Sequence, residues 1–185
     1  HRSIAEIAAA ENKDPIDVFI DAALAKNLKQ FFLQPLANEN DEYALEMIKH
    51  PNAVVTFSDS GAHVSQIMDS SLQTHMFSHW VREKQELTLE QAVRMLSFVP
   101  ASYWGLTGRG LLREGWNADV VVFNPDTISP AMPELTYDLP AGARRLKQKA
   151  TGIAATVVNG EVVLRNNEPT GALPGKLLRG PLANR

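Results

Sequence analysis

The chain contains no cysteine, which excludes disulfides and thiolate metal ligands within its 185 residues. It also lacks any uninterrupted apolar run of the roughly 18 residues that a membrane span needs, and its first residues do not resemble a signal peptide. The formal net charge of -3 gives no general attraction to nucleic acid or anionic membranes. We therefore expect a cytoplasmic protein whose partners are small molecules, with no nucleic-acid or membrane partner.

Hydrophobic residues make up 44% of the chain and charged residues 21%, which is typical of a globular protein. The first residue is His1 and not methionine, so we expect that an upstream portion precedes this sequence. We find no internal repeat, low-complexity tract or coiled-coil heptad.

The first half of the sequence has clear signals for the starts of helices. Ser3 and Glu6 form a capping-box pattern, and Asp14-Pro15 supplies a cap followed by proline at the first helical position. A third helix is expected over residues 43–48, because the proline at position 51 prevents it from continuing. These signals predict three helices before residue 50.

Two further helices are predicted downstream. One covers residues 72–82, and a better signalled one begins at Thr88, where Thr88 and Gln91 form a second capping box. Pro100 is expected to end this second helix.

Two short apolar runs in the first half predict buried strands, at Phe31–Leu33 and Ala53–Phe57. Asp59 follows the second run, in the sequence Ser-Asp-Ser-Gly-Ala-His. Enzymes of the α/β class expose catalytic carboxylates where a buried strand gives way to a glycine-containing loop. Asp59 is therefore the first candidate for chemistry, although Ser-Asp-Ser-Gly is also good turn chemistry and Asp59 could merely cap the loop.

The pattern changes near Leu106, where we place a domain boundary. Glycines break the chain up to position 115, and strand-like runs follow at residues 118–123, 153–158 and 161–164. Asn159-Gly160 separates the last two runs and favours a type I′ turn, which makes this the strongest hairpin signal in the chain. A fourth strand is possible at Gly110–Leu112.

Alternating strands and helices before the boundary predict a parallel α/β architecture, but with only two strands. A closed (β/α)₈ barrel needs about 250 residues, so only its last units would fit. The three convincing strands after the boundary would leave open sheet edges. Both halves therefore have the size of parts of larger domains.

Several motifs, in order, resemble the C-terminal portion of the amidohydrolase superfamily, and in particular its N-acyl-D-amino-acid deacylase (D-aminoacylase) branch. The motifs that carry this resemblance are Ser58–His63, Leu89–Arg94, Pro100-Ala101, Arg109–Phe123, Val157–Val163 and Thr170–Gly180. Any one of these motifs is weak, whereas their order along nearly the whole chain is specific.

The resemblance implies the last units of a (β/α)₈ barrel at residues 1–105 and part of a small β-sandwich with a C-terminal tail at residues 106–185. It implies a zinc-dependent hydrolase acting on a non-peptide amide bond of a small N-acyl amino acid. Asp59 matches the family aspartate that lies beside the metal and transfers a proton from water to the leaving nitrogen, so it is both the catalytic and the metal-binding candidate. His63 is a candidate for substrate binding, or it could simply bond a backbone group of its loop.

The family's remaining metal ligands lie upstream of where this chain begins, so tight zinc binding and activity are not expected of the isolated chain. The alternative function is a non-catalytic module that covers its open sheet edges by homo-oligomerisation.

Three other features have simpler interpretations. His75 and His79 have the spacing of a helical zinc motif but lack its adjacent glutamate, so a pair on a helix surface is the default. The basic cluster at residues 144–149 has no interleaved aromatics and is expected to be a solvated loop. The glycine-rich segment 105–110 lacks the spacing of a nucleotide site and predicts turns.

Overall fold

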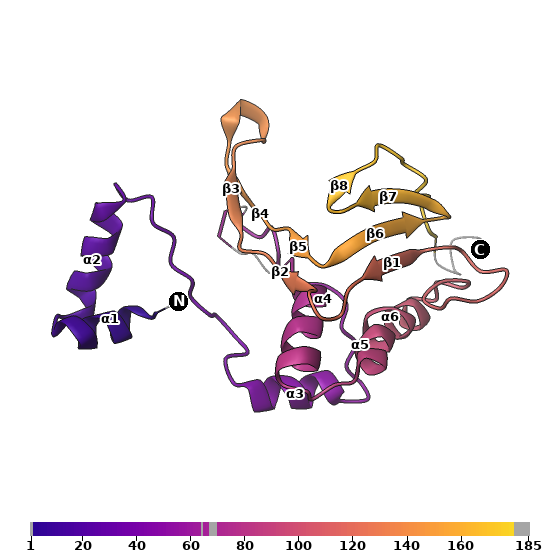
Figure 1. Ribbon diagram of the computed structural model, residues 1–185, viewed down its shortest axis with the longest axis horizontal. Coiled ribbons are helices and arrows are strands. Elements are labelled where there is room, and N and C mark those ends of the chain that lie inside the picture. The colour runs from indigo at the N-terminus through magenta and orange to yellow at the C-terminus, as the bar shows by residue number, and fades with distance from the viewer. Residues whose placement is uncertain (1, 64, 67–69, 180–185) are drawn as a thin grey trace. The chain divides into compact units, whose positions relative to one another are not determined.

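The computed structural model describes residues 2–63, 65–66 and 70–179 (Figure 1). Its helices are α1 (Ile4–Glu11), α2 (Pro15–Ala25), α3 (Asp41–Lys49), α4 (Leu72–His75), the π-helix η1 (Met76–Glu83), α5 (Leu89–Leu96), α6 (Phe98–Tyr103) and the 3₁₀ turn η2 (Pro140–Gly142). Its strands are β1 (Val120–Phe123), β2 (Ser129–Pro130), β3 (Glu134–Thr136), β4 (Arg145–Lys147), β5 (Ala150–Thr151), β6 (Ile153–Val158), β7 (Glu161–Arg165) and β8 (Glu168–Pro169). In the described part of the chain, no helix is long and apolar enough to cross a membrane.

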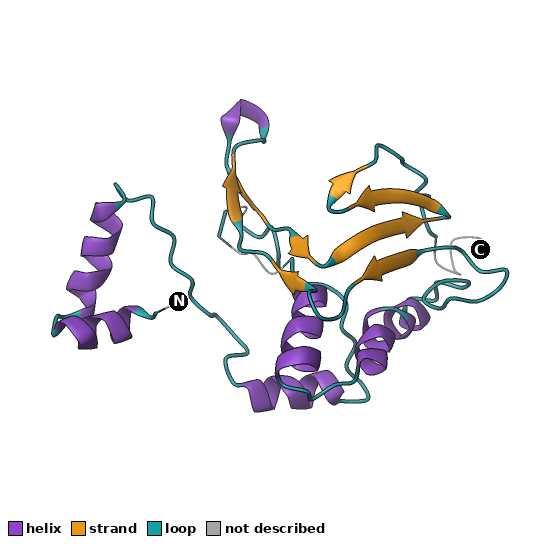
Figure 2. Ribbon diagram, viewed as in Figure 1, coloured by secondary structure: helices purple, strands orange, loops and turns teal. Residues whose placement is uncertain are grey.

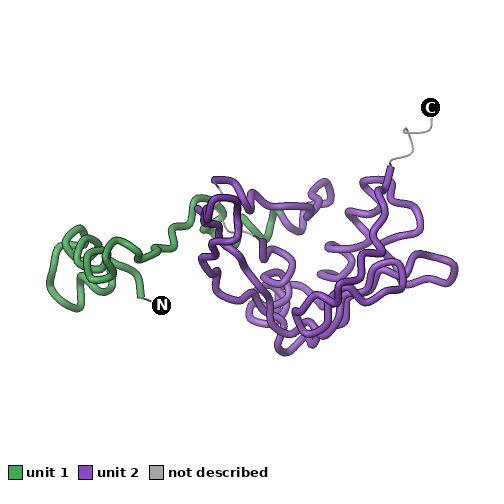
Figure 3. Tube along the Cα trace, turned by 90° about the horizontal axis from the view of Figure 1, so that it is seen from above, with its two compact units in different colours: residues 1–47 green, residues 48–185 purple. Residues whose placement is uncertain are grey.

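The chain divides into two compact units, residues 1–47 and 48–185 (Figure 3). The expected boundary near Leu106 falls inside the second unit, and the division into barrel and sandwich parts stays a prediction.

The first unit contains a pair of packed helices, α1 and α2. Both predicted caps are present: Ser3 and Glu6 form the reciprocal capping box of α1, and the Asp14 side chain accepts a hydrogen bond from the Ile16 amide of α2. Ala8 and Val18 are buried, and the rings of Phe19 and Phe32 lie 4.3 Å apart. The predicted helices of this unit are confirmed.

The second unit has its core on η1 and α5. Met76, Phe77 and Trp80 of η1 are buried. Leu87, which precedes the cap of α5, and Ala92 within α5 are buried too. The predicted helix over residues 72–82 is confirmed in position, but most of it is wound as a π-helix, a form that sequence periodicity does not distinguish.

Two contacts join η1 to the sheet region of the same unit, one to β1 and one to the turn that follows it. The ring of Phe77 lies 4.8 Å from that of Phe123 in β1. The Arg82 guanidinium donates hydrogen bonds to the backbone oxygens of Ile128 at 2.8 Å and of Pro125 at 3.1 Å. Ile128 is 2% exposed, so Arg82 holds the buried end of an otherwise exposed turn against the helix.

The main sheet is four-stranded in the order β1-β6-β7-β8, and every strand pairing that the structure describes is antiparallel (Figure 2). The predicted hairpin is confirmed: β6 and β7 flank Asn159 and Gly160, whose φ angles of 48° and 86° suit a type I′ turn. Short two-stranded ribbons, β2 with β5 and β3 with β4, complete the strands.

Several local predictions were wrong. Phe31–Leu33 and Ala53–Phe57 are extended without strand pairing in the described residues, and Leu33 and Phe57 are 95% and 80% exposed. An apolar run becomes a strand only when a neighbouring strand takes up its backbone hydrogen bonds. The segment Gly110–Leu112 is a bend.

Two further predictions need correction. Pro100 does not end the helix that begins after Thr88, because that helix ends at Leu96 and Pro100 lies in the first turn of α6, where its missing amide hydrogen costs nothing. The basic cluster is not a loop, since Arg145–Lys147 forms β4 and pairs with β3.

The β3–β4 ribbon is closed by an ion pair near its tip. Arg145 donates to both carboxylate oxygens of Asp138, at 2.6 and 2.7 Å. This hydrogen-bonded guanidinium lowers the pKa of Asp138 from 3.8 to about 2. The pair is exposed, so its effect is confined to the ribbon.

We expect the β3–β4 ribbon to become less ordered at low pH. The folded pKa of Asp138 is the lower one, so the ion pair contributes fully above pH 3.8 and is lost as the pH falls through about 2. Amide chemical shifts of residues 134–147, followed by NMR from pH 5 to 2, should show this transition. In Asp138→Asn the amides of residues 137–145, which lie at the tip and away from the Glu134 carboxylate, should no longer show this transition. A transition that persists at these amides in the variant would contradict the assignment.

Candidate functional site

Asp59 lies in an exposed turn of the second unit. Its backbone oxygen accepts a hydrogen bond from the Ala62 amide at 2.9 Å, and Gly61 within the turn has a φ of +90°. The Asp59 side chain makes no hydrogen bond or ion pair with any other described residue. Its carboxylate is therefore accessible to a small molecule. The strand expected before Asp59, at residues 53–57, has no pairing partner among the described residues.

His63 lies four positions further on, at the end of the same turn. It is exposed and has a φ of 54°, an uncommon value for a residue with a side chain. The turn thus brings Asp59 and His63 into one exposed loop. Their catalytic, metal-binding and substrate-binding roles stay predictions.

The described residues do not by themselves fit a metal ion, because they hold no group of three or more His, Asp or Glu side chains with suitable geometry. A structural or catalytic zinc requires three or four protein ligands. Asp59 could supply one carboxylate oxygen, so zinc cannot be assigned from this chain's own residues.

His75 and His79 lie on one helical face, as the spacing predicts. Their rings stack 4.8 Å apart with an interplanar angle of 13°, and His79 Nδ1 lies 3.4 Å from the carboxylate of Glu83. The chain's described residues give this pair no third metal ligand. The interpretation as a helix-surface pair therefore stays the simplest one.

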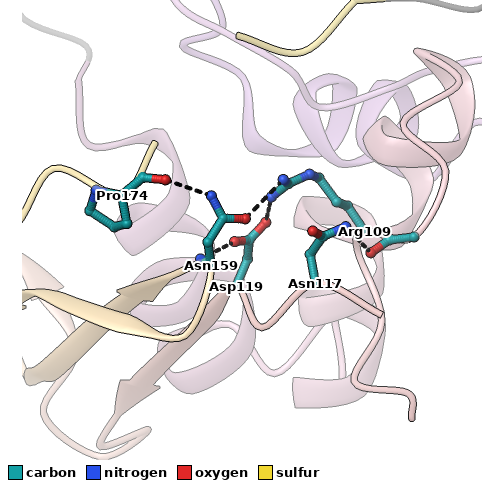
Figure 4. Close-up of polar contacts among 6 residues, drawn as sticks. Arg109, Asn117, Asp119, Asn159 and Pro174 are labelled. Carbon is teal, nitrogen blue, oxygen red and sulfur yellow. Dashed lines mark hydrogen bonds and ion pairs between the residues drawn. The ribbon is translucent and has the colours of Figure 1, made fainter. Parts of the chain in front are cut away.

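A second polar cluster, which sequence reasoning did not single out, lies at the turn of the β6–β7 hairpin. Arg109 forms an ion pair with Asp119 and donates to the Asn159 side-chain oxygen at 3.1 Å. Asp119 accepts from the Asn159 amide at 2.9 Å, and the Asn159 side-chain nitrogen donates to the Pro174 oxygen at 2.7 Å. We name these four residues the Asn159 clamp; Figure 4 shows that they converge from the glycine-rich loop, the start of β1, the hairpin turn and the C-terminal segment.

The Asn159 clamp is partly buried, with the side chain of Arg109 15% exposed and that of Asp119 31%. Paired charges at this depth hold neighbouring segments together. Asn117 supports the same loop, because its side chain donates to the Gly108 oxygen at 3.1 Å. The only sequence signals for this cluster were the Asn-Gly turn and the separate motifs that contain Arg109 and Asp119.

The described residues form a mixed α/β chain with an exposed carboxylate loop and an antiparallel C-terminal sheet, and this chain aligns with about a third of the length of solved D-aminoacylase structures. A D-aminoacylase studied for its binuclear metal center aligns with a TM-score of 0.54 and 22% identity, covering 92% of this chain and 33% of its own. An N-acyl-D-glutamate deacylase from Bordetella bronchiseptica, complexed with zinc and a phosphonate inhibitor, aligns with a TM-score of 0.51 and 29% identity, covering 88% of this chain and 31% of its own. The described residues do not close a barrel.

Sequence comparison identifies the family of this chain. The model of the amidohydrolase family matches residues 3–164, so the chain belongs to the amidohydrolase family. Two curated relatives from Alcaligenes xylosoxydans xylosoxydans, an N-acyl-D-aspartate deacylase and an N-acyl-D-glutamate deacylase, are 38% and 39% identical over 106 residues, which is 57% of this chain. The chain spans about a fifth of the length of these relatives, at 19% and 20%. The expected resemblance to D-aminoacylases is confirmed.

Proposed function

We propose that this chain is the C-terminal part of a zinc-dependent amidohydrolase that hydrolyses N-acyl-D-amino acids to a carboxylate and a free D-amino acid. The observation that carries the proposal is the family match over residues 3–164, together with relatives that deacylate N-acyl-D-aspartate and N-acyl-D-glutamate. The proposal assigns residues 1–105 to the last units of a (β/α)₈ barrel and residues 106–185 to part of a β-sandwich.

Asp59 is the catalytic residue in this proposal. Its exposed carboxylate accepts a proton from the attacking water and returns it to the leaving nitrogen as the C–N bond breaks. His63, in the same loop, contacts the substrate. Since the described residues do not complete a metal site, the proposal places the other zinc ligands in polypeptide outside this sequence.

The test is a deacylase assay on the full-length gene product. We expect release of the free amino acid from N-acetyl-D-glutamate or N-acetyl-D-aspartate, and slower or no release from the L enantiomers. The 185-residue chain alone, assayed in parallel with added zinc, should be inactive. Absence of hydrolysis of every N-acyl amino acid by zinc-loaded full-length protein would overturn the proposal.

Homo-oligomerisation through open sheet edges stays a separate prediction. In the described sheet β1 is an edge strand, and its residues Val121 and Val122 are 52% and 49% exposed. An exposed apolar edge is the feature that such assembly would cover.

A further inference from the structure

The hairpin turn contains the one Asn-Gly sequence in the chain, at Asn159-Gly160. Asparagine is among the thermolabile residues, and it is least protected when glycine follows, because no side chain shields the next backbone nitrogen. The reaction at such a sequence is deamidation. The Gly160 nitrogen attacks the side-chain carbonyl carbon of Asn159, the bond to the side-chain nitrogen breaks, and ammonia leaves. Water then opens the cyclic imide to aspartate or isoaspartate.

Every group that this reaction needs is held by a hydrogen bond in the folded protein. The Gly160 nitrogen donates to the Ala118 oxygen at 2.9 Å. The side-chain oxygen and nitrogen of Asn159 are bound to Arg109 and Pro174, and its backbone nitrogen is bound to Asp119. Attack by the Gly160 nitrogen therefore requires that the Asn159 clamp open first.

The product cannot rebuild the same contacts. An aspartate at position 159 has no side-chain N–H for the Pro174 oxygen, so two acceptors would face each other at the present 2.7 Å. It would also place a second carboxylate beside Asp119, with Arg109 as their shared partner. Isoaspartate adds a backbone carbon to a two-residue turn whose length sets the register of β6 and β7.

The hydrogen bond from Asn159 to Pro174 holds the C-terminal segment, residues 171–179. Thr170 is tied to β7, since its amide donates to the Val163 oxygen and its hydroxyl to the Val162 oxygen. Within the described residues, the bond from Asn159 to Pro174 is the one hydrogen bond between residues 171–179 and the chain before Thr170. Leu173 and Leu177 are 94% and 78% exposed and add little packing.

We propose that Asn159 is a deamidation site that the Asn159 clamp keeps closed, and that its conversion to a carboxylate releases residues 171–179. The modification is irreversible and consumes only water. It is independent of the proposed hydrolase activity, because none of the clamp residues belongs to the Asp59 loop.

Peptide mapping by mass spectrometry tests whether the folded protein protects Asn159 from deamidation. The folded wild-type chain, incubated at mildly alkaline pH, should lose the Asn159 amide at least about tenfold more slowly than the same chain in denaturant. Arg109→Gln should raise the folded rate by about tenfold, because it opens the clamp. Arg145→Gln, which breaks the exposed pair with Asp138 instead, should leave the rate at Asn159 unchanged.

Equal rates in the folded and denatured wild-type chains would overturn the proposal, as would an unchanged rate in a folded Arg109→Gln variant. If circular dichroism shows that Arg109→Gln does not fold, hydrogen exchange of the Gly160 amide in the wild type decides. Protection of this amide supports the closed clamp, and rapid exchange in the folded protein refutes it.

Limited proteolysis tests whether a carboxylate at position 159 releases residues 171–179. Trypsin should cleave after Lys176 about threefold or more faster in Asn159→Asp than in the wild type, because the segment is no longer held at Pro174. Asn124→Asp provides a matched control in another exposed turn, and should leave cleavage after Lys176 unchanged. Equal cleavage of wild type and Asn159→Asp would overturn this half of the proposal.

Discussion

Replacement of Asp59 by asparagine is expected to lower the rate of N-acyl-D-amino-acid hydrolysis by the full-length gene product by about 10²- to 10⁴-fold, the range for loss of a general acid–base group. The amide is close in size to the carboxylate but cannot take up the proton of the attacking water. The turn itself should survive, because its hydrogen bond from Ala62 uses the backbone oxygen of Asp59 and not the side chain.

The loss should appear in kcat, measured by release of the free amino acid at saturating substrate, since the missing proton transfer belongs to the chemical step. Asp126→Asn is the matched control: Asp126 is also an exposed aspartate in a turn of the second unit, and this variant should keep the wild-type rate. A wild-type kcat in Asp59→Asn would remove Asp59 from the mechanism. Circular dichroism of both variants separates a chemical effect from misfolding.

Helix starts were predictable because the groups that specify them are neighbours in sequence. Each capping box needs a side chain and an amide three residues apart, and the pairs Ser3 with Glu6 and Thr88 with Gln91 are formed as predicted. The same holds for the Asn159-Gly160 turn, whose φ angles are set by two adjacent residues. Such signals do not depend on the rest of the fold.

Strands were less predictable, because their hydrogen bonds come from residues distant in sequence. Ala53–Phe57 has the composition of a buried strand, yet no described residue pairs with it and Phe57 is 80% exposed. In β6, by contrast, a similar apolar run is paired on both sides, by β1 and β7. Composition gives a segment its tendency to form a strand, and the neighbouring strands determine whether that strand is formed.

The same distinction applies to the two polar sites. Asp59 and His63 could be identified from one short loop, because they are four residues apart. The Asn159 clamp joins positions 109, 119, 159 and 174, and no local pattern links an arginine to an asparagine 50 residues later. Only the antiparallel pairing of β1 with β6, which carries Asp119 to the hairpin turn, brings its members together.

Gly152→Ala is expected to cause the largest loss of stability in this chain, about 3 kcal/mol or more of the free energy of unfolding. Gly152 has a φ of +77°, and a Cβ atom there would lie 2.5 Å from the Ile128 nitrogen and 2.6 Å from its Cα. These are backbone atoms of a residue that is 2% exposed, so they cannot move aside as a flexible side chain would. Their displacement would also strain the hydrogen bonds from Arg82 to the Ile128 oxygen and from the Asn124 amide to the Gly152 oxygen.

Gly115→Ala separates the clash from the backbone strain. Gly115 has nearly the same φ, +79°, but a Cβ atom there would meet nothing within 4 Å. Its substitution should therefore cost only the strain of a left-handed residue, about 1 kcal/mol. Urea unfolding of both variants measures the difference, and equal losses would mean that the close approach of residue 152 to Ile128 does not constrain the fold. A larger loss at position 152 would instead show that this contact, which joins the turn before β2 to the residue before β6, constrains the fold of the second unit.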